Sequence, residues 1–399
     1  IGANLVEVHG QHETVGLLDW KTHWGLLDVY SGLEPQAAAV GEAANRLKAA
    51  EAKLLRTHRI RADTTVVPAN VAYPTDAGLL TKAVRRIAAT GQRIQAAGGA
   101  VRTRVRDRSR AAGKRAHAIA AKLRSRSALG RDETTAAVLK TTGELAGLAE
   151  TVARDAERLL INGRRAIRRA QVKAAALAAR GEHDAAAGRR RGRLVRAVND
   201  LHTLLAATRQ IAAQTRQRLA GATPDGATRR VSLHDADARP IAKGRLGKPV
   251  EFGYKAQVTD NDDGIVCDHT VELGNPPDAP ALAPAVARVT QRAGRTPRTV
   301  TADRGYGEKR VEDALHDLGV RTVVIPRKGK PGAARRATEH RPAFRRTIKW
   351  RTGCEGRIST LKRGYGWDRT RIDTTEGARI WTGHGVLTHN LVKISALAQ

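Results

Sequence analysis

The pattern of hydrophobic and polar positions predicts a strand, a long helical segment and then alternating strands and helices. Residues 1–31 are typical of a short strand and a compact loop, and residues 36–55 of an amphipathic helix. The β-branched run of 59–76, broken by two prolines, predicts a strand followed by an extended segment. From 79 to about 219, Ala, Arg and Leu recur with helical periodicity. We expect interruptions at four glycine positions: Gly98-Gly99, Gly130, Gly163 and Gly181.

After the turn-rich stretch 221–228 the pattern changes to short β-branched runs that alternate with amphipathic segments. It predicts strands at 229–234, 250–259, 264–273, 297–303 and 320–326, and helices at about 279–293, 308–318, 345–363 and 376–397. The chain is therefore expected to be α/β, with a helical domain between its first strand and the others.

The charge changes this picture from a generic α/β protein to one that binds a polyanion. The chain carries 71 Lys and Arg against 39 Asp and Glu, a net charge of +32, and its hydrophobic content of 41% is enough for a core. A field of this sign points to nucleic acid as the partner. Residues 1–56 differ, with five basic and seven acidic residues, which suggests that the chain has two origins joined near 55–58. The chain contains no Met, which predicts a fragment or an unusual reading of a longer gene.

Cysteine spacing and hydropathy exclude several classes of protein. Cys267 and Cys354 are far apart and lack a Cys-x-x-Cys neighbour, so neither a zinc site nor a disulfide framework is supported. The sequence has no signal-peptide pattern and no run of about eighteen apolar residues. We expect a soluble cytoplasmic protein associated with the nucleoid.

The most basic stretch, residues 101–130, holds ten Lys or Arg against one Asp. Solvated helix faces usually mix charges of both signs, whereas this stretch does not. We therefore expect it to bind the phosphate backbone of double-stranded DNA. Its candidate contacts are Arg102, Arg104, Arg106 and Arg108.

The stretch "TVTADRGYGEKR" (299–310) places Asp303 where an apolar strand ends. The carboxyl ends of strands in α/β sheets are where ligands gather, and Gly305 is expected to let the chain turn away sharply. Asp after a strand is also a common turn former, so Asp303 alone does not decide between a ligand site and a turn.

Two further carboxylates make a catalytic site the better interpretation. In "RADTTVV", Asp63 lies within a strand of otherwise buried type, and in "RTIKWRTGCEGRISTLKR", Glu355 lies on a predicted helix. Arg351 precedes Glu355 by four residues and Lys362 follows it by seven, so the three share one helical face. Carboxylates beside fixed positive charge suit two-metal phosphoryl transfer, in which two Mg²⁺ ions about 3.5–4 Å apart act on the attacking and leaving oxygens.

These residues resemble a known family, the insertion-sequence DDE transposases with a ribonuclease H-like catalytic core. The resemblance covers about 59–397 and rests on "DTTVVPANVAYPTDAGLL", "GKPVEFGYKAQVTDNDDG", "VELGNPPDAPAL", "VTADRGYGEKRVEDAL" and "EGRISTLKRGYGWDRTR". It implies that Asp63, Asp303 and Glu355 are the catalytic triad and hold Mg²⁺ or Mn²⁺. It further implies metal-dependent cleavage and strand transfer of double-stranded DNA, with a homodimer in the DNA complex.

The resemblance also implies a domain order and one departure from the family pattern. Residues 57–77 would hold the first core strand, 78–228 a basic helical insertion, and 229–399 the remainder of the core. Many relatives carry Tyr-x2-Arg-x3-Glu-x6-Lys around the Glu. This chain keeps Arg351, Glu355 and Lys362, to which phosphate contacts are assigned, but has Ile348 at the Tyr position.

Asp235 and Asp237, in "SLHDADARPIAKGR", are rivals for the first carboxylate. If either took that role, the helical segment would be an N-terminal domain, whereas Asp63 makes it an insertion. A second functional hypothesis is a catalytically inactive DNA-binding remnant of a transposase. Mg²⁺-dependent strand nicking separates the two.

The first 56 residues have a resemblance of their own. The stretch "NLVEVHGQHETVGLLDWKTHWGLLDVYSGLE" (4–34) is similar to part of RecN, a bacterial repair ATPase. The resemblance implies that Gln11 is a nucleotide-loop glutamine. The chain has no Gly-x-x-x-x-Gly-Lys-[Ser/Thr] loop to bind phosphates, so a RecN-type ATPase is the weakest hypothesis.

Two secondary assignments complete the sequence-based picture. Asp278 is expected to cap the helix that follows it. Four aromatic residues are expected to pack the last helices against the sheet, with base stacking as the alternative: Trp350, Tyr365, Trp367 and Trp381.

Overall fold

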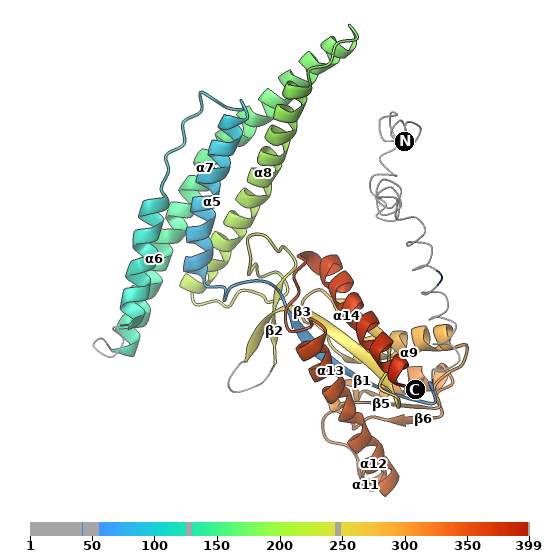
Figure 1. Cartoon of the computed structure of the whole chain (residues 1–399). Helices are drawn as coiled ribbons and strands as arrows, with labels where there is room; N and C mark the ends of the chain where they lie inside the picture. Colours follow the sequence, from blue (N-terminus) through green and yellow to red (C-terminus); the bar gives the residue numbers. More distant parts are fainter. Residues whose placement is uncertain (1–41, 43–55, 125–129, 244–248, 398–399) are drawn as a thin grey trace.

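The computed structural model describes residues 42, 56–124, 130–243 and 249–397 (Figure 1). The elements predicted for 1–31 and 36–55 lie outside the described residues, apart from Glu42. The described chain is a mixed α/β structure in which helices are the majority. It comprises a helical bundle and a mixed sheet covered by helices. In the described ranges, no helix is long and apolar enough to span a membrane.

The bundle consists of α5 (Asp76–Ala96), α6 (Ser109–Arg124), α7 (Arg131–Ala178) and α8 (Ala185–Leu219). The Thr75 side chain accepts a hydrogen bond from the Gly78 amide and caps α5, and Asp184 caps α8 in the same way. The four helices bury one apolar core at their interfaces, which includes Leu80, Ile87, Leu145 and Leu201.

Three of the four predicted helix interruptions are confirmed, and the one at Gly163 is wrong. Helix α7 runs through Gly163 without a break. A Cβ atom at this position would lie 2.7 Å from Val198 Cγ2 of α8. The glycine therefore serves close approach of two helices rather than a turn.

The sheet has β1 (Arg59–Pro68) at its centre. The other strands are β2 (Arg239–Ala242), β3 (Val250–Asn261), β4 (Val266–Glu272), β5 (Thr299–Ala302) and β6 (Thr322–Val324). β1 pairs antiparallel with β3 and parallel with β5, which in turn pairs parallel with β6. β2 and β4 both pair with β3 on the edge away from β1. Strands that precede and follow the bundle in sequence thus belong to one sheet.

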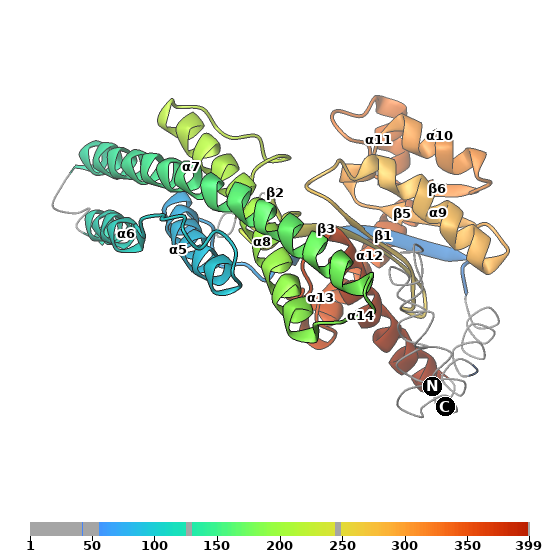
Figure 2. The same cartoon turned by 90° about the horizontal axis from the view of Figure 1, so that it is seen from above.

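Helices cover both faces of this sheet. The remaining elements are α9 (Ala279–Ala293), η1 (Arg304–Tyr306), α10 (Lys309–Asp317), α11 (Ala333–His340), α12 (Pro342–Arg351), α13 (Gly353–Gly364) and α14 (Thr374–Leu397). Figure 2 shows α9 and α10 on one side of β1 and α13 and α14 on the other. Ile60 and Ala62 of β1 pack against α9 and α10, whereas Val258 of β3 packs against α13 and α14.

Two predictions about elements are corrected by the structure, which also contains β2, a strand that the pattern did not predict. Residues 229–234 form no strand, because their backbone groups make hydrogen bonds with side chains. The side-chain amide of Gln214 donates to the C=O of Arg230 and accepts from its N–H. Ser232 Oγ accepts hydrogen bonds from two later backbone amides. The sequence pattern missed α11. The helix predicted at 345–363 is divided at Thr352 into α12 and α13.

Candidate active site

The register of β1 and β5 places Asp63 beside Asp303. Ala62 and Ala302 are paired in the parallel ladder, and each is followed by one of the two aspartates. Because side chains alternate along strands, both carboxylates lie on the face opposite the two alanines. Asp63 is paired with Val258 of β3, which packs against Cys354 and Ile358 of α13. The two aspartates therefore face the helix that carries Glu355.

Arg351 joins two of the three predicted carboxylates. Its Nη1 donates to Asp63 Oδ2 at 3.1 Å and its Nη2 donates to Glu355 Oε1 at 2.9 Å. Arg351 ends α12 whereas Glu355 lies in the first turn of α13. The predicted single helical face is thus made by two helices, and the ion pair across their junction keeps Glu355 next to β1.

Arg61 of β1 explains why the helix divides there. Its Nη1 donates to the Trp350 carbonyl at 2.6 Å, and a Cβ atom at Gly353 would clash with the same guanidinium. In an unbroken helix the Trp350 carbonyl would accept a hydrogen bond from the amide four residues later. Here it accepts one from the Arg61 side chain instead. Asp260 holds Arg61 in place through bonds of 2.6 and 2.9 Å.

A polar cavity of about 590 Å³ contains all three predicted carboxylates together with both predicted cations. Its lining includes Asp63, Asp303, Glu355, Arg351 and Lys362. The Asp63 side chain is 13% exposed, whereas that of Glu355 is 61% exposed. A ligand that enters the cavity would reach Glu355 first and the aspartates at greater depth.

The pKa of Asp63 is raised to about 6, with burial as the largest cause. The neighbouring charges of Asp303 and Glu355 also raise it, while the Thr64 amide and the Arg351 guanidinium lower it. Repulsion and burial therefore outweigh the one ion pair that Asp63 forms. A cation bound directly to these carboxylates would relieve this cost.

The pKa of Asp303 is also raised, first by burial and then by the charge of Asp278. Its carboxylate accepts a hydrogen bond from the Gly305 amide at 2.8 Å. A Cβ atom at Gly305 would lie 2.9 Å from Asp303 Oδ1 and 3.2 Å from Asp278 Oδ2. Glycine at 305 thus serves the approach of two carboxylates. The chain does turn away from β5 at η1, as expected, but the φ angle of Gly305 is not positive, so this turn does not itself require glycine.

Asp278 is a residue of the cavity that the sequence pattern assigned to another role. It stands at the N-cap of α9, but its side chain makes no capping bond, so that prediction is wrong. Its carboxylate pairs instead with Lys255 of β3, 2.6 Å away, and both residues line the cavity. The preceding prolines and the following apolar helix resembled a capped helix start. The available signal was Lys255 in the middle of a predicted strand.

The cavity has the donor chemistry that suits a hard divalent cation. Its Asp and Glu side chains offer carboxylate oxygens, the ligands that Mg²⁺ and Mn²⁺ prefer. The buried Tyr306 hydroxyl has no hydrogen-bond partner in the described chain, and its pKa is raised by burial and by the charges of Asp278, Asp63 and Asp303. Among described residues no three ligating side chains converge closely enough to hold a metal as they stand. Arg351 lies between Asp63 and Glu355.

Asp235 and Asp237 lie outside the cavity. Asp235 is 1% exposed and accepts bonds from the amides of Asp237 and Ala238 and from the Tyr254 hydroxyl. Asp237 accepts bonds from the amide and hydroxyl of Thr375 at the start of α14. Both carboxylates are saturated by structural partners.

The four arginines predicted to bind DNA precede α6 in an extended connection rather than in a helix. Arg102, Arg104 and Arg106 are exposed, whereas Arg108 is half-buried and lies 4.0 Å from Asp155. They belong to the bundle and do not line the cavity. The structure thus separates the predicted binding surface from the predicted catalytic residues.

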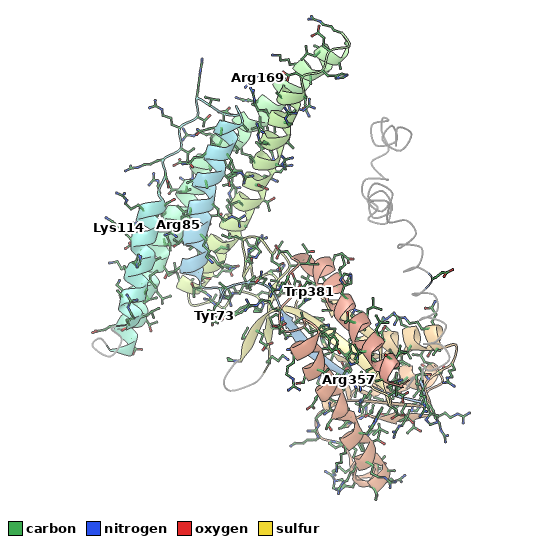
Figure 3. The ribbon with its side chains drawn as sticks, in the orientation of Figure 1. Tyr73, Arg85, Lys114, Arg169, Arg357 and Trp381 are labelled. Carbon is green, nitrogen blue, oxygen red and sulfur yellow. The ribbon has the colours of Figure 1, made fainter. Side chains whose placement is uncertain are left out.

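The aromatic residues of the last helices are mainly structural. Trp367 is fully buried in the core between the sheet and α13–α14, as expected, and its indole donates to the Thr382 carbonyl. Trp381 donates to the Gly366 carbonyl and is labelled in Figure 3. The guanidiniums of Arg59 and Arg61 each lie 4.6 Å from the Trp350 ring centroid. Base stacking stays a prediction.

A family model described as "Transposase DDE domain" matches residues 224–391. The match supports a DDE transposase. It covers Asp303 and Glu355 but neither Asp63 nor the first 56 residues, whose similarity to RecN is not supported. No curated protein and no solved structure matches the chain.

Proposed function

We propose that the protein is a DDE transposase that cleaves DNA strands at the ends of an insertion sequence and transfers them to target DNA. One observation carries the proposal: Asp63 and Asp303 are adjacent by strand register, and Arg351 links Asp63 to Glu355 in one cavity. The transposase match and the net charge of +32 agree with it. The mixed sheet, with carboxylates from two strands and a helix, supports a ribonuclease H-like core.

Each residue of the cavity has a role that follows from its position. Asp63, Asp303 and Glu355 would hold Mg²⁺ or Mn²⁺, which when bound supplies activation of the attacking oxygen and stabilisation of the leaving oxygen. Arg351 holds Asp63 and Glu355 together and, with Lys362, would bind phosphate oxygens of the DNA. Lys255 holds Asp278 beside Asp303, which increases the negative charge available to a cation.

The proposal extends to the bundle and to the assembly. The bundle would be an insertion after the first core strand, with Arg102, Arg104, Arg106 and Arg108 contacting DNA. Each chain carries one cavity of this kind in its described part, whereas an element has two ends to be cut and joined. We therefore propose a homodimer in the DNA complex.

Asp303→Asn and Glu355→Gln test the proposal. Each should abolish Mg²⁺-dependent nicking of a DNA duplex, because each removes a negatively charged oxygen ligand while keeping the side chain's size. DNA affinity in metal-free buffer should stay near that of the parent, since basic residues elsewhere supply it. Nicking is measured on supercoiled plasmid and affinity by fluorescence anisotropy.

Asp368→Asn, at an exposed residue outside the cavity, is the matched control and should nick at the parent rate. If Asp303→Asn or Glu355→Gln nicks at that rate too, the triad is wrong. If the parent binds DNA but never nicks it with Mg²⁺ or Mn²⁺, the chain is an inactive DNA-binding remnant.

A further inference from the structure

Helices α7 and α8 extend beyond the rest of the bundle as an isolated two-helix arm, residues 167–193. At 48 residues α7 is about 72 Å long, more than twice the length of α5. Near the end of α5, Ile94 lies against Gly163 of α7, and Gly99 lies against Leu194 of α8. Beyond this level the two helices continue alone, away from the sheet (Figure 1).

The arm has no hydrophobic core of its own. No residue between 167 and 193 is buried, and Val172 is 71% exposed. The two helices face each other through small side chains such as Ala170, Ala174 and Gly188, with a hollow of about 300 Å³ between them. Burial inside the chain therefore does not explain why the arm is present.

The arm is strongly basic and its charge is not neutralised. It carries eight Lys or Arg against two acidic residues, Glu182 and Asp184. All eight except Arg191 are exposed, and within these described residues none forms an ion pair. Figure 3 labels Arg169 on this projecting part.

The rest of the bundle, between the arm and the sheet, differs. Several of its arginines pair across helices with acidic partners: Arg93 with Asp200, Arg209 with Glu157, and Arg216 with Glu150. In the arm, by contrast, Arg169 and Lys173 stand four residues apart on one helical face, as do Arg189 and Arg193. Like charges at this spacing destabilise a helix, so the arm as it stands carries uncompensated repulsion.

We infer that the arm is a further DNA-binding surface, separate from the cavity and from residues 101–108, and that it contacts the phosphate backbone of duplex DNA without reading its sequence. A polyanion removes the repulsion between the like charges of the arm. The arm contains no Phe, Tyr or Trp on which an unpaired base could stack, and Gln171 is its only amide side chain. Phosphate contact is the mode that this composition allows.

The arm lies far from the proposed site of chemistry. Residues 194–219 of α8 lie between the arm and the C-terminal end of α8, from which the chain continues to the sheet. This part of the helix is about 39 Å long. DNA held by the arm is therefore a different stretch from the DNA in the cavity. The inference rests on the proposed function only in taking DNA as the partner, and it does not require an active triad.

The test compares three double variants in metal-free buffer, where no cleavage occurs. Arg169→Gln with Lys173→Gln, and Arg189→Gln with Arg193→Gln, each remove two charges from one helix of the arm. The third variant, Arg298→Gln with Arg321→Gln, is the control and removes two exposed charges just before β5 and β6. These positions lie at the N-terminal ends of the two strands, whereas Asp303 follows the C-terminal end of β5. Since none of the six residues is buried, all three variants should keep the parent's circular dichroism and melting temperature.

The readout is the slope of log K against log salt for a random-sequence duplex. Each arm variant should flatten the slope by up to about 1.8, because each phosphate contact contributes about 0.9. The control pair should leave the slope unchanged. Protection of amides 167–193 from hydrogen exchange should rise when duplex is added to the parent.

Slopes of both arm variants equal to the parent's would overturn the inference, as would an equal change in the control pair. Loss of nicking by Asp303→Asn has no bearing on these slopes. Failure of the arm and failure of the catalytic proposal are therefore separate results.

Discussion

The carboxyl group of Asp63 combines burial with repulsion from two neighbouring carboxylates. Its pKa of about 6 in the folded chain compares with an ordinary value of 3.8. The folded state therefore takes up a proton at a higher pH than the unfolded chain does. The stability contributed in this way is fully present below about pH 4 and is lost as pH rises through about 6.

Asp63→Asn should accordingly stabilise the fold at pH 7.5 in metal-free buffer. A shift of about two pKa units corresponds to at most about 3 kcal/mol, and we expect a melting temperature several degrees above the parent's. The difference should shrink toward zero as pH is lowered to 4. Differential scanning fluorimetry between pH 4 and 8 measures it.

Two controls accompany this pH series. Asp368→Asn is the matched variant for the same measurement, because its carboxylate is exposed and outside the cavity. Added Mg²⁺ should raise the melting temperature of the parent more than that of Asp63→Asn. A variant less stable than the parent at pH 7.5 would show that the Arg351 ion pair outweighs burial and repulsion.

At the residue scale, the sequence located the three carboxylates but not their surroundings. Spacing brought Arg351 and Glu355 together, since four residues on or near a helix place side chains side by side. Asp278 was missed because a carboxylate before a helix is more often a cap. Only its ion pair with Lys255 in the folded chain shows that Asp278 belongs to the cavity.

At the scale of the element, glycine distinguishes close contact from chain reversal. Gly163 lies against Val198, whereas Gly192, also within a helix of the bundle, has ordinary space around it, with its nearest neighbour 3.6 Å from a built Cβ atom. Alanine favours a helix over glycine by about 0.8–1.0 kcal/mol. At Gly163 this gain is opposed by overpacking of about 1–3 kcal/mol.

Gly192→Ala should therefore raise the free energy of unfolding by up to about 1 kcal/mol, and Gly163→Ala should lower it by about 1 kcal/mol. Urea titration followed by circular dichroism measures both. Combining Gly163→Ala with Val198→Ala should cost less than the sum of the two single changes, because the clash disappears. Equal stabilisation by the two glycine variants would mean that α7 and α8 are not in contact at Gly163.

Element type was more predictable than element boundary or local backbone bonding. The helical run of 79–219 follows from periodicity, which burial of one face enforces. The strands around Asp63 and Asp303 follow from β-branched runs that are buried on both faces. Residues 230–234 alternate polar and apolar side chains as a strand does, yet their backbone hydrogen bonds go to the side chains of Gln214 in α8 and of Ser232. Partners of that kind cannot be read from a local pattern.

At the scale of the whole molecule, the loop after α8 connects the bundle to the sheet. Within this loop, Arg230 forms two hydrogen bonds with Gln214 of α8, and Asp235 accepts one from the hydroxyl of Tyr254 in β3. β1 precedes the bundle in sequence and β3 follows it after β2, and these two strands are paired along Ile60–Pro68. Strands from both sides of the bundle in sequence therefore belong to one sheet, and side-chain hydrogen bonds join the base of the bundle to that sheet.

The two candidate first carboxylates can be separated by stability and activity together. Asp235→Ala removes the acceptor for two amides and for the Tyr254 hydroxyl, and each buried donor left without a partner costs about 1–3 kcal/mol. We expect a marked fall in melting temperature. Asp237→Ala should cost less, because Asp237 is only half-buried and loses two bonds to Thr375.

At a temperature where the chain is still folded, Asp235→Asn should nick DNA at near the parent rate, whereas Asp63→Asn should not nick at all. The physical reason is that Asp235 is saturated by neutral donors outside the cavity, whereas Asp63 lies inside it beside Asp303. Circular dichroism at the assay temperature establishes that each variant is folded. The reverse result, with Asp63→Asn active and a folded Asp235→Asn inactive, would move the first carboxylate into the loop after α8. The bundle would then precede the catalytic core, even though β1 pairs within its sheet.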